Sequence, residues 1–189
     1  MGSAVRPSGN PAARGRATCH TRRVESALII PVSLPARLER ERRRHVPIAA
    51  LGVPAHVTLL FPFISSGDLT DRDRRRIARI LGEQRAFEYQ LGRVRAWPTA
   101  LYLEVLPAAP FVRTVRALVS AYPAWVPYGG AFPYVPHVTI AELASAEAPR
   151  IADPRQPLHR RAQRAALIAQ DEDGRWRTRW RFAVGGSDS

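Results

Sequence analysis

The chain has 189 residues, and 46% of them are hydrophobic, which suits one globular domain or two small lobes that share a cleft. No apolar run approaches the length of a membrane span, and the single cysteine, Cys19, excludes an internal disulfide, so we expect a soluble cytoplasmic protein without a membrane partner. The formal net charge is +13 and every basic residue is arginine, which favours a polyanionic partner, although a coding bias against lysine would produce the same composition.

The chain begins with a stretch that we expect to be a disordered basic tail, residues 1–23. This stretch is rich in Arg, Ala, Gly, Pro and Ser and has no hydrophobic periodicity. Such a composition does not bury enough apolar surface to offset the entropy lost when a chain becomes ordered. Cys19 lies within it, so we expect no metal or nucleophile role for this thiol.

The first ordered elements are predicted to be a buried strand and a solvated helix. Residues 26–33 form a compact apolar run that is closed by Pro35, as in a buried strand. Residues 34–45 carry alternating charges, with Leu34 and Leu38 one helical turn apart. This pattern predicts a helix with one apolar edge and an otherwise solvated surface.

A short string, His56-Val57-Thr58-Leu59, follows this helix. Side chains alternate along an extended strand, so the string would place His56 and Thr58 on one face and two apolar residues on the other. Pro54, two residues before the histidine, favours an extended backbone. One such string alone is most simply an ordinary core or edge strand.

A second helix is predicted after this string. Thr70 and Asp73 have the spacing of a capping box at a helix start. Ile77, Ile80 and Leu81 would form its buried stripe. Arginines crowd its first turns, which favours a solvated face over a phosphate-binding patch.

The middle of the chain predicts two strands, a helix and a loop. Residues 87–94 and 100–106 alternate as two strands around a turn at 97–99, and apolar residues at helical spacing over 111–122 predict an amphipathic helix packed on a sheet. The loop over 123–136 is dense in proline, glycine and aromatic residues. Its aromatic residues would either line a cleft or cover a sheet edge: Tyr128, Phe132 and Tyr134.

The string then recurs as His137-Val138-Thr139-Ile140, directly after Pro136. A histidine, an apolar residue, a threonine and an apolar residue form a rare sequence, so its duplication is informative where a single copy is not. If the two strands face one another, two imidazoles and two hydroxyls converge on one small volume.

The chain is predicted to end in a hairpin. A linker runs over 144–157, and residues 164–170 and 175–184 would pair as strands around a tight turn at Asp173-Gly174. Trp176 and Trp180 are an even number of residues apart, which predicts that they share one strand face and serve packing. Helices and strands mix without a long parallel series, so the fold class is α+β.

The two strings resemble the signature of the 2H phosphoesterase superfamily, in particular its branch of 2'-5' RNA ligase-like proteins and 2',3'-cyclic phosphodiesterases. The resemblance extends over the stretch from His56 to Phe63 and the one from Tyr128 to Ile140. It implies a two-lobed fold of antiparallel sheets with pseudo-twofold symmetry around a central cleft and helices on the outside. We expect residues 24–184 to form this domain and 185–189 a flexible C-terminus.

The resemblance also implies a function: hydrolysis of a 2',3'-cyclic phosphate on RNA ends or nucleotides, with 2'-5' RNA ligation as the reverse reaction. His56 and His137 would be the catalytic acid and base, and Thr58 and Thr139 would bind the phosphate. We expect no metal or other cofactor, and a monomer. The alternative is a non-catalytic RNA- or nucleotide-binding module on the same fold.

Aromatic and basic residues are further candidates for the substrate site. Tyr134 and Phe63 are the first candidates for stacking on a base or sugar, and Trp97 and Tyr102 are further candidates. Each of the four also fits a core position. In many relatives a basic residue follows the second motif, where this chain has Glu142. An arginine from elsewhere in the chain would then neutralise the phosphate.

Overall fold

The computed structural model describes residues 25–143 and 149–186. The predictions for residues 1–23, for Cys19, for the start of the 144–157 linker and for residues 187–189 lie outside this part of the chain. No helix in the described ranges is long and apolar enough to cross a membrane.

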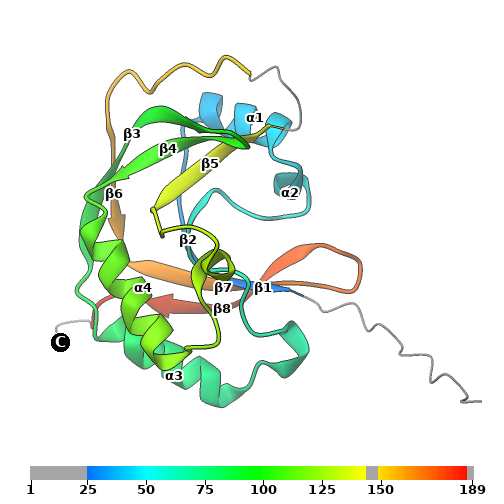
Figure 1. The fold of residues 1–189 in the computed structure, drawn as a ribbon, viewed down its shortest axis with the longest axis vertical. Helices are drawn as coiled ribbons and strands as arrows, with labels where there is room; N and C mark the ends of the chain where they lie inside the picture. Colours follow the sequence, from blue (N-terminus) through cyan, green and yellow to red (C-terminus); the bar gives the residue numbers. More distant parts are fainter. Residues whose placement is uncertain (1–24, 144–148, 187–189) are drawn as a thin grey trace, which may run out of the picture.

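Two four-stranded antiparallel sheets form two lobes, one above the other in Figure 1, which confirms the predicted α+β class. The first sheet has the order β2-β1-β7-β8 and consists of β1 (Ser26–Pro31), β2 (His56–Leu60), β7 (Arg164–Gln170) and β8 (Trp176–Ala183). The second has the order β5-β4-β3-β6 and consists of β3 (Phe87–Trp97), β4 (Ala100–Leu106), β5 (His137–Glu142) and β6 (Leu158–Ala162). Each histidine motif therefore begins a strand at the edge of one sheet.

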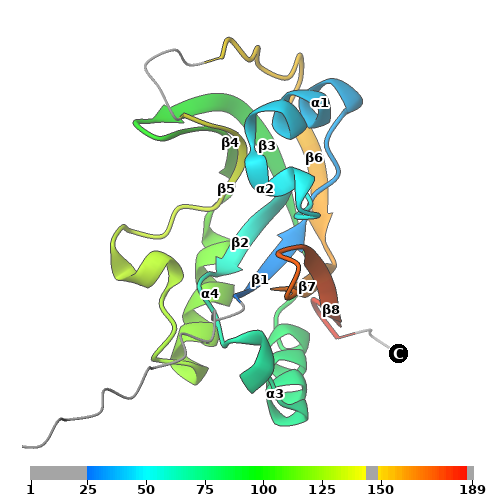
Figure 2. The ribbon, with the colours of Figure 1, turned by 90° about the vertical axis from the view of Figure 1, so that its right-hand side faces the viewer.

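The helices cover the sheets from outside (Figures 1 and 2). They are α1 (Ala36–His45), α2 (Pro47–Ala50), α3 (Asp71–Gly82) and α4 (Ala109–Ala121), with short 3-10 turns η1 (Ser66–Asp68) and η2 (Pro127–Gly130). α1 packs near β5 and α4 packs near β2, so each of these helices contacts the motif strand of the opposite lobe. Each of these two helices therefore connects its own lobe to the other lobe.

Local sequence explains where α3 begins. The side chain of Thr70 accepts a hydrogen bond from the backbone N–H of Asp73 at 3.3 Å, and the Asp73 carboxylate accepts one from the backbone N–H of Thr70 at 3.1 Å. This reciprocal pair is the predicted capping box, and it satisfies two backbone donors that a helix start leaves open.

One large core cluster spans both lobes. It contains Val57 of β2 and Val138 of β5, which are fully buried, together with Phe111 of α4. The apolar halves of the two motif strands thus pack into a common core, and this leaves their histidine and threonine sides facing away from it.

Two elements were not predicted. β6 is a short strand of mainly basic residues that pairs with β3 at the edge of the second sheet, and its side chains give no apolar alternation. α2 is a single turn directly after Val46. Both are too short to produce a periodic pattern in the sequence.

Candidate active site

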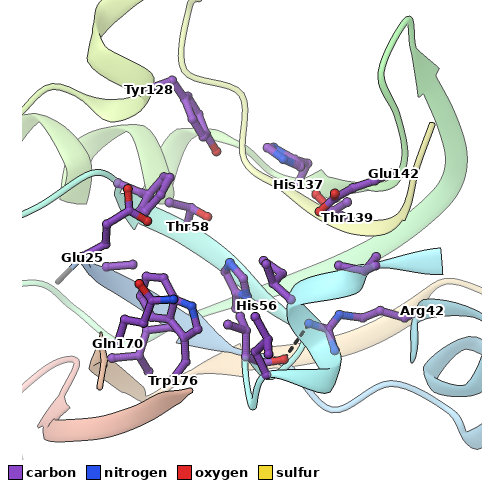
Figure 3. Close-up of a pocket in the computed structure, with 17 residues that line it drawn as sticks. Glu25, Arg42, His56, Thr58, Tyr128, His137, Thr139, Glu142, Gln170 and Trp176 are labelled. Atoms are coloured by element: carbon purple, nitrogen blue, oxygen red, sulfur yellow. Dashed lines mark hydrogen bonds between the residues drawn. The ribbon is translucent and has the colours of Figure 1, made fainter. Parts of the chain in front are cut away.

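The two motif strands meet at a pocket between the lobes. β2 and β5 approach one another, and the pocket of about 350 Å³ is lined by all four predicted residues, His56, Thr58, His137 and Thr139 (Figure 3). The structure therefore brings together the groups that the duplicated string predicted to converge.

Both motif strands carry a bulge just after the threonine. In β2 the pairing with β1 slips so that Leu59 and Leu60 are both fully buried, and Phe61 then turns toward the pocket. In β5 the pairing with β4 slips in the same way, which turns Glu142 toward the pocket. Bulges of this kind redirect a side chain and are frequent next to active sites.

Each imidazole is oriented by the backbone two residues before it. Nδ1 of His56 lies 2.7 Å from the carbonyl oxygen of Pro54, and Nδ1 of His137 lies 2.8 Å from that of Val135. A carbonyl only accepts, so Nδ1 carries the hydrogen in both rings. The neutral rings therefore keep Nε2 free as a proton acceptor, and a proton gained there makes the ring a donor.

The surroundings of the two histidines differ. The pKa of His56 is lowered to about 4, mainly by burial and to a smaller extent by the charges of Arg42 and His137, while the hydrogen bond to Pro54 opposes this shift. Burial also lowers the pKa of His137, where the hydrogen bond to Val135 again opposes it. Three aromatic rings surround the His137 ring, with centroids at 4.6, 5.5 and 6.2 Å, from Trp97, Tyr102 and Tyr128.

Arg42 is the arginine of the pocket, and the sequence did not identify it. It lies on α1, which we predicted to be a solvated helix, yet its side chain is only 3% exposed. The guanidinium donates to the carbonyl oxygen of Val53 at 2.8 Å and lies 3.5 Å from the Glu39 carboxylate. Burial lowers its pKa while Glu39 raises it, and an arginine in this setting stays charged at neutral pH.

Tyr134, predicted to stack on substrate, instead supports the first motif strand. It does not line the pocket, and its hydroxyl donates to the backbone carbonyl of Thr58 at 2.8 Å. Tyr128, which is half-buried, lines the pocket instead, with its ring directed toward Thr58 (Figure 3). Its backbone is in the left-handed region, at φ 56°, which a tyrosine rarely adopts, and its N–H donates to the carbonyl of Phe61 at 2.7 Å.

The prediction that Phe63 stacks on substrate does not fit the structure. Phe63 is 2% exposed and packs edge-on against Tyr122 and Trp125 in the core. Trp97 and Tyr102 stack on each other at 3.9 Å beside His137, without lining the pocket themselves. Their contribution is to the position of that imidazole.

The chain as a whole was compared with known families. Residues 30–174 match the sequence model of the 2'-5' RNA ligase superfamily. The chain belongs to this family. The predicted membership in the 2H phosphoesterases is thereby confirmed.

Solved structures show the same two-lobed fold as this 2H protein. TT0787 of Thermus thermophilus is 20% identical, with a TM-score of 0.60 over 86% of this chain and 99% of that one. E. coli LigT complexed with 3'-AMP is 23% identical, with a TM-score of 0.56 over 86% of this chain and 98% of that one. Comparison with curated protein sequences gave no match.

The remaining pocket residues of this 2H protein divide into two ends. Glu142 lies near Thr139, and Arg42 lies at the same end (Figure 3). Trp176 lies at the other end with Gln170 and Glu25. Within residues 25–143 and 149–186, no three His, Cys, Asp or Glu side chains are grouped as a metal site would require.

Trp176 and Trp180 do not share a face as predicted. A bulge at Arg179 shifts the pairing of β8 with β7, so that Leu167 pairs with Trp180 and Ile168 with Thr178. Trp180 consequently packs against the main core, while Trp176 joins the smaller cluster under the pocket.

Proposed function

We propose that this protein is a metal-independent phosphodiesterase that hydrolyses a 2',3'-cyclic phosphate, or a related cyclic phosphodiester, on RNA ends or nucleotides. The observation that carries this proposal is the convergence of both histidines and both threonines on one pocket. Two imidazoles with free Nε2 atoms supply a base and an acid on the two sides of a bound phosphorus.

The reaction requires two proton transfers. One imidazole takes a proton from water as the water oxygen forms a bond to phosphorus. The bond between phosphorus and one ribose oxygen breaks, and the second imidazole protonates that departing oxygen. The product is a ring-opened phosphate monoester with one free ribose hydroxyl. With an RNA 5'-hydroxyl in place of water, the same two groups would form a 2'-5' linkage.

The threonines place the phosphate between the rings. The hydroxyls of Thr58 and Thr139 would donate to the non-bridging oxygens, which positions phosphorus and stabilises the charge that builds up in the transition state. The buried charge of Arg42, which lines the same pocket as His56, adds a favourable field for an anion. Arg42 would thus supply the positive charge near the phosphate that Glu142, after the second motif, does not.

Binding of the substrate anion promotes uptake of the missing proton from solvent. Burial holds the pKa of both imidazoles below 6.5, so both are neutral at pH 7 in the free protein. A phosphodiester anion in contact with an imidazole favours its charged form. Substrate binding is therefore coupled to proton uptake by one ring, and the pair reaches the opposite protonation states that the reaction needs.

Relatives with this fold hold ligands of the required chemistry. E. coli LigT was crystallised with 3'-AMP and with phosphate. The first of these ligands joins a phosphate to a nucleoside, and this supports a nucleotide or RNA end as the substrate of the present chain.

The test is turnover of 2',3'-cyclic nucleotides in the presence of a chelator. Wild type should release ring-opened nucleotide, and His56→Ala and His137→Ala should each lose nearly all activity. If wild type forms no product from cyclic nucleotides, RNA cyclic phosphates or ADP-ribose cyclic phosphate while it still binds them, the protein is a binding module. Loss of activity in the chelator would contradict a metal-independent mechanism.

A further inference from the structure

The end of the pocket away from Arg42 is built on three neighbouring strands, β1, β7 and β8. The backbone N–H of Gln170 donates to the carbonyl of Glu25 at 2.9 Å, and Gln170 is also the cross-strand partner of Trp176. Directly opposed residues of antiparallel strands show their side chains on the same face. These three residues therefore form one row across the sheet, and each of them lines the pocket.

Apolar side chains form the surface beside this row. We call it the shelf and define it as Ala27, Phe61, Ile168 and Trp176. The bulge in β2 turns Phe61 onto the shelf, where its ring centroid lies 6.4 Å from that of Trp176.

A backbone hydrogen bond and a close glycine contact fix the position of Trp176 in the shelf, and exposed apolar groups border it. The backbone N–H of Trp176 donates to the carbonyl of Leu51 at 2.7 Å, and a Cβ on Gly52 would come within 2.6 Å of the Trp176 carbonyl oxygen. Ile48 and Leu51 at the rim remain 38% and 39% exposed. Exposed apolar groups beside an apolar surface are typical of a ligand site.

The polar groups at the edge of the shelf include two acceptors. The Nε2 of Gln170 donates one hydrogen to the carbonyl of Gly174 at 3.0 Å, which leaves the acceptor Oε1 and the second Nε2 hydrogen for a ligand. The Glu25 carboxylate, which accepts only, forms no ion pair or side-chain hydrogen bond with any residue in the described ranges. A ligand on the shelf thus meets two neighbouring acceptors.

We propose that the shelf and its two acceptors are a nucleobase subsite that selects guanine, an inference that rests on the proposed function for the phosphate end of the pocket. Ile29 of β1 pairs with Thr58, and Glu25 lies four residues before Ile29 in the chain. At the rise of a strand this is roughly 13 Å, a distance that a ribose and a purine bridge. The phosphate would lie between the histidines and the base on the shelf.

The acceptor pair distinguishes guanine from the other bases. Guanine presents two adjacent donors, N1–H and the 2-amino group, on its Watson–Crick edge. Adenine and cytosine present an amino group beside an acceptor nitrogen, and uracil presents one N–H between two carbonyls. Each of these three bases presents an acceptor beside its donor, and an acceptor that faces the Glu25 carboxylate, which has no hydrogen to donate, is penalised strongly.

The experiment compares kcat/KM for the 2',3'-cyclic phosphates of guanosine, adenosine, cytidine and uridine. Guanosine should exceed each of the others by about tenfold or more. The inosine analogue, which lacks only the 2-amino group, should fall below guanosine. In Glu25→Gln the guanosine-to-uridine ratio should approach one, and in the matched control Glu172→Gln, an exposed carboxylate on the turn between β7 and β8, it should stay at the wild-type value.

Equilibrium binding of GMP and UMP to wild type and Glu25→Gln separates this inference from the proposed function. Hydrolysis of all four cyclic phosphates at equal rates, or a guanosine preference that survives Glu25→Gln, would overturn the guanine subsite and leave the phosphodiesterase intact. Selective GMP binding that Glu25→Gln abolishes, without hydrolysis of any cyclic phosphate, would support the subsite and overturn the phosphodiesterase. Glu25 is exposed, and thermal unfolding checks that the variants fold.

Discussion

β2 and β5 have nearly the same local backbone geometry. Each starts with the motif histidine, buries the valine that follows, hydrogen-bonds the imidazole to the carbonyl two residues upstream, and bulges after the threonine. These features depend on a few adjacent residues. A repeated short string therefore reproduces its local geometry even in two different sheets.

The two strands differ in what the rest of the chain places around them. A buried arginine acts on His56, whereas three aromatic rings surround His137. After the bulge, β2 presents Phe61 to the pocket and β5 presents Glu142. The string thus fixes where the imidazoles point, while distant elements fix their charge environment.

The largest expected effect concerns the feature that the two strands share. His56→Ala and His137→Ala should each lower kcat for a 2',3'-cyclic nucleotide by ~10²–10⁴-fold, because each removes one proton-transfer group. The double variant should be little worse than either single variant, since the pair acts as a unit. His159→Ala on β6, outside the pocket, is the matched control and should retain wild-type activity. Additive losses in the double variant would contradict a paired mechanism.

A second prediction tests the difference between the strands through stability. Below pH 6.5 an unfolded His56 binds a proton, whereas the native side chain, with its pKa lowered to about 4, does not. Unfolding therefore takes up a proton, and the free energy of unfolding falls as the pH decreases from 6.5 to 4. The loss from this residue is at most about 3 kcal/mol, at ~1.4 kcal/mol for each pH unit.

Denaturant titrations at pH 7 and pH 4.5 measure this loss. His56→Gln should lose less stability than wild type between the two conditions, because it removes the group that titrates. His137→Gln should also lose less stability than wild type between the two conditions, because burial lowers the pKa of His137 as well. Equal acid sensitivity of wild type and His56→Gln would show that this histidine is not the buried neutral group described above.

The threonines should contribute less than the histidines. Thr58→Val and Thr139→Val keep the side-chain shape and remove only the hydroxyl, so each should lower kcat/KM by at most about 10²-fold. The matched comparison is the serine variant at each position, which restores the hydroxyl and should recover most of the activity. A valine variant as active as wild type would remove the phosphate-binding role of that position.

The smallest effect is expected from the support behind Thr58. Tyr134→Phe removes the hydrogen bond to the Thr58 carbonyl and should cost about 1 kcal/mol of unfolding free energy. The substitution should displace Thr58 on β2 and lower the activity a few-fold. Thr139 should keep its position, because no equivalent hydrogen bond supports it among the described residues. A large drop in the affinity for substrate would instead indicate that Tyr134 contacts the ligand.

The sequence predicted what depends on neighbouring residues and missed what depends on distant ones. The two strings, the capping box at Thr70 and the hairpin at Gly174 were all readable from local patterns. Arg42 was not, because its burial results from a contact with the Val53 carbonyl that a charged helix pattern does not reveal.

The errors in the aromatic residues have a related cause. Assigning alternate residues of a strand to opposite faces assumes regular pairing. A single bulge adds one residue and so moves every later side chain to the other face. The bulges in β2 and β8 turned Phe61 into the pocket and separated Trp176 from Trp180. Neither bulge leaves a glycine or proline signal at its position, so the sequence offered no sign of them.

The most direct test of the central claim is the pH dependence of kcat/KM for the cyclic nucleotide that the protein hydrolyses best. Two imidazoles that act in opposite protonation states predict a bell-shaped profile, in which activity falls at low pH as the base is protonated and at high pH as the acid loses its proton. A profile with one limb only, or one that His56→Ala and His137→Ala leave unchanged in shape and height, would contradict the account.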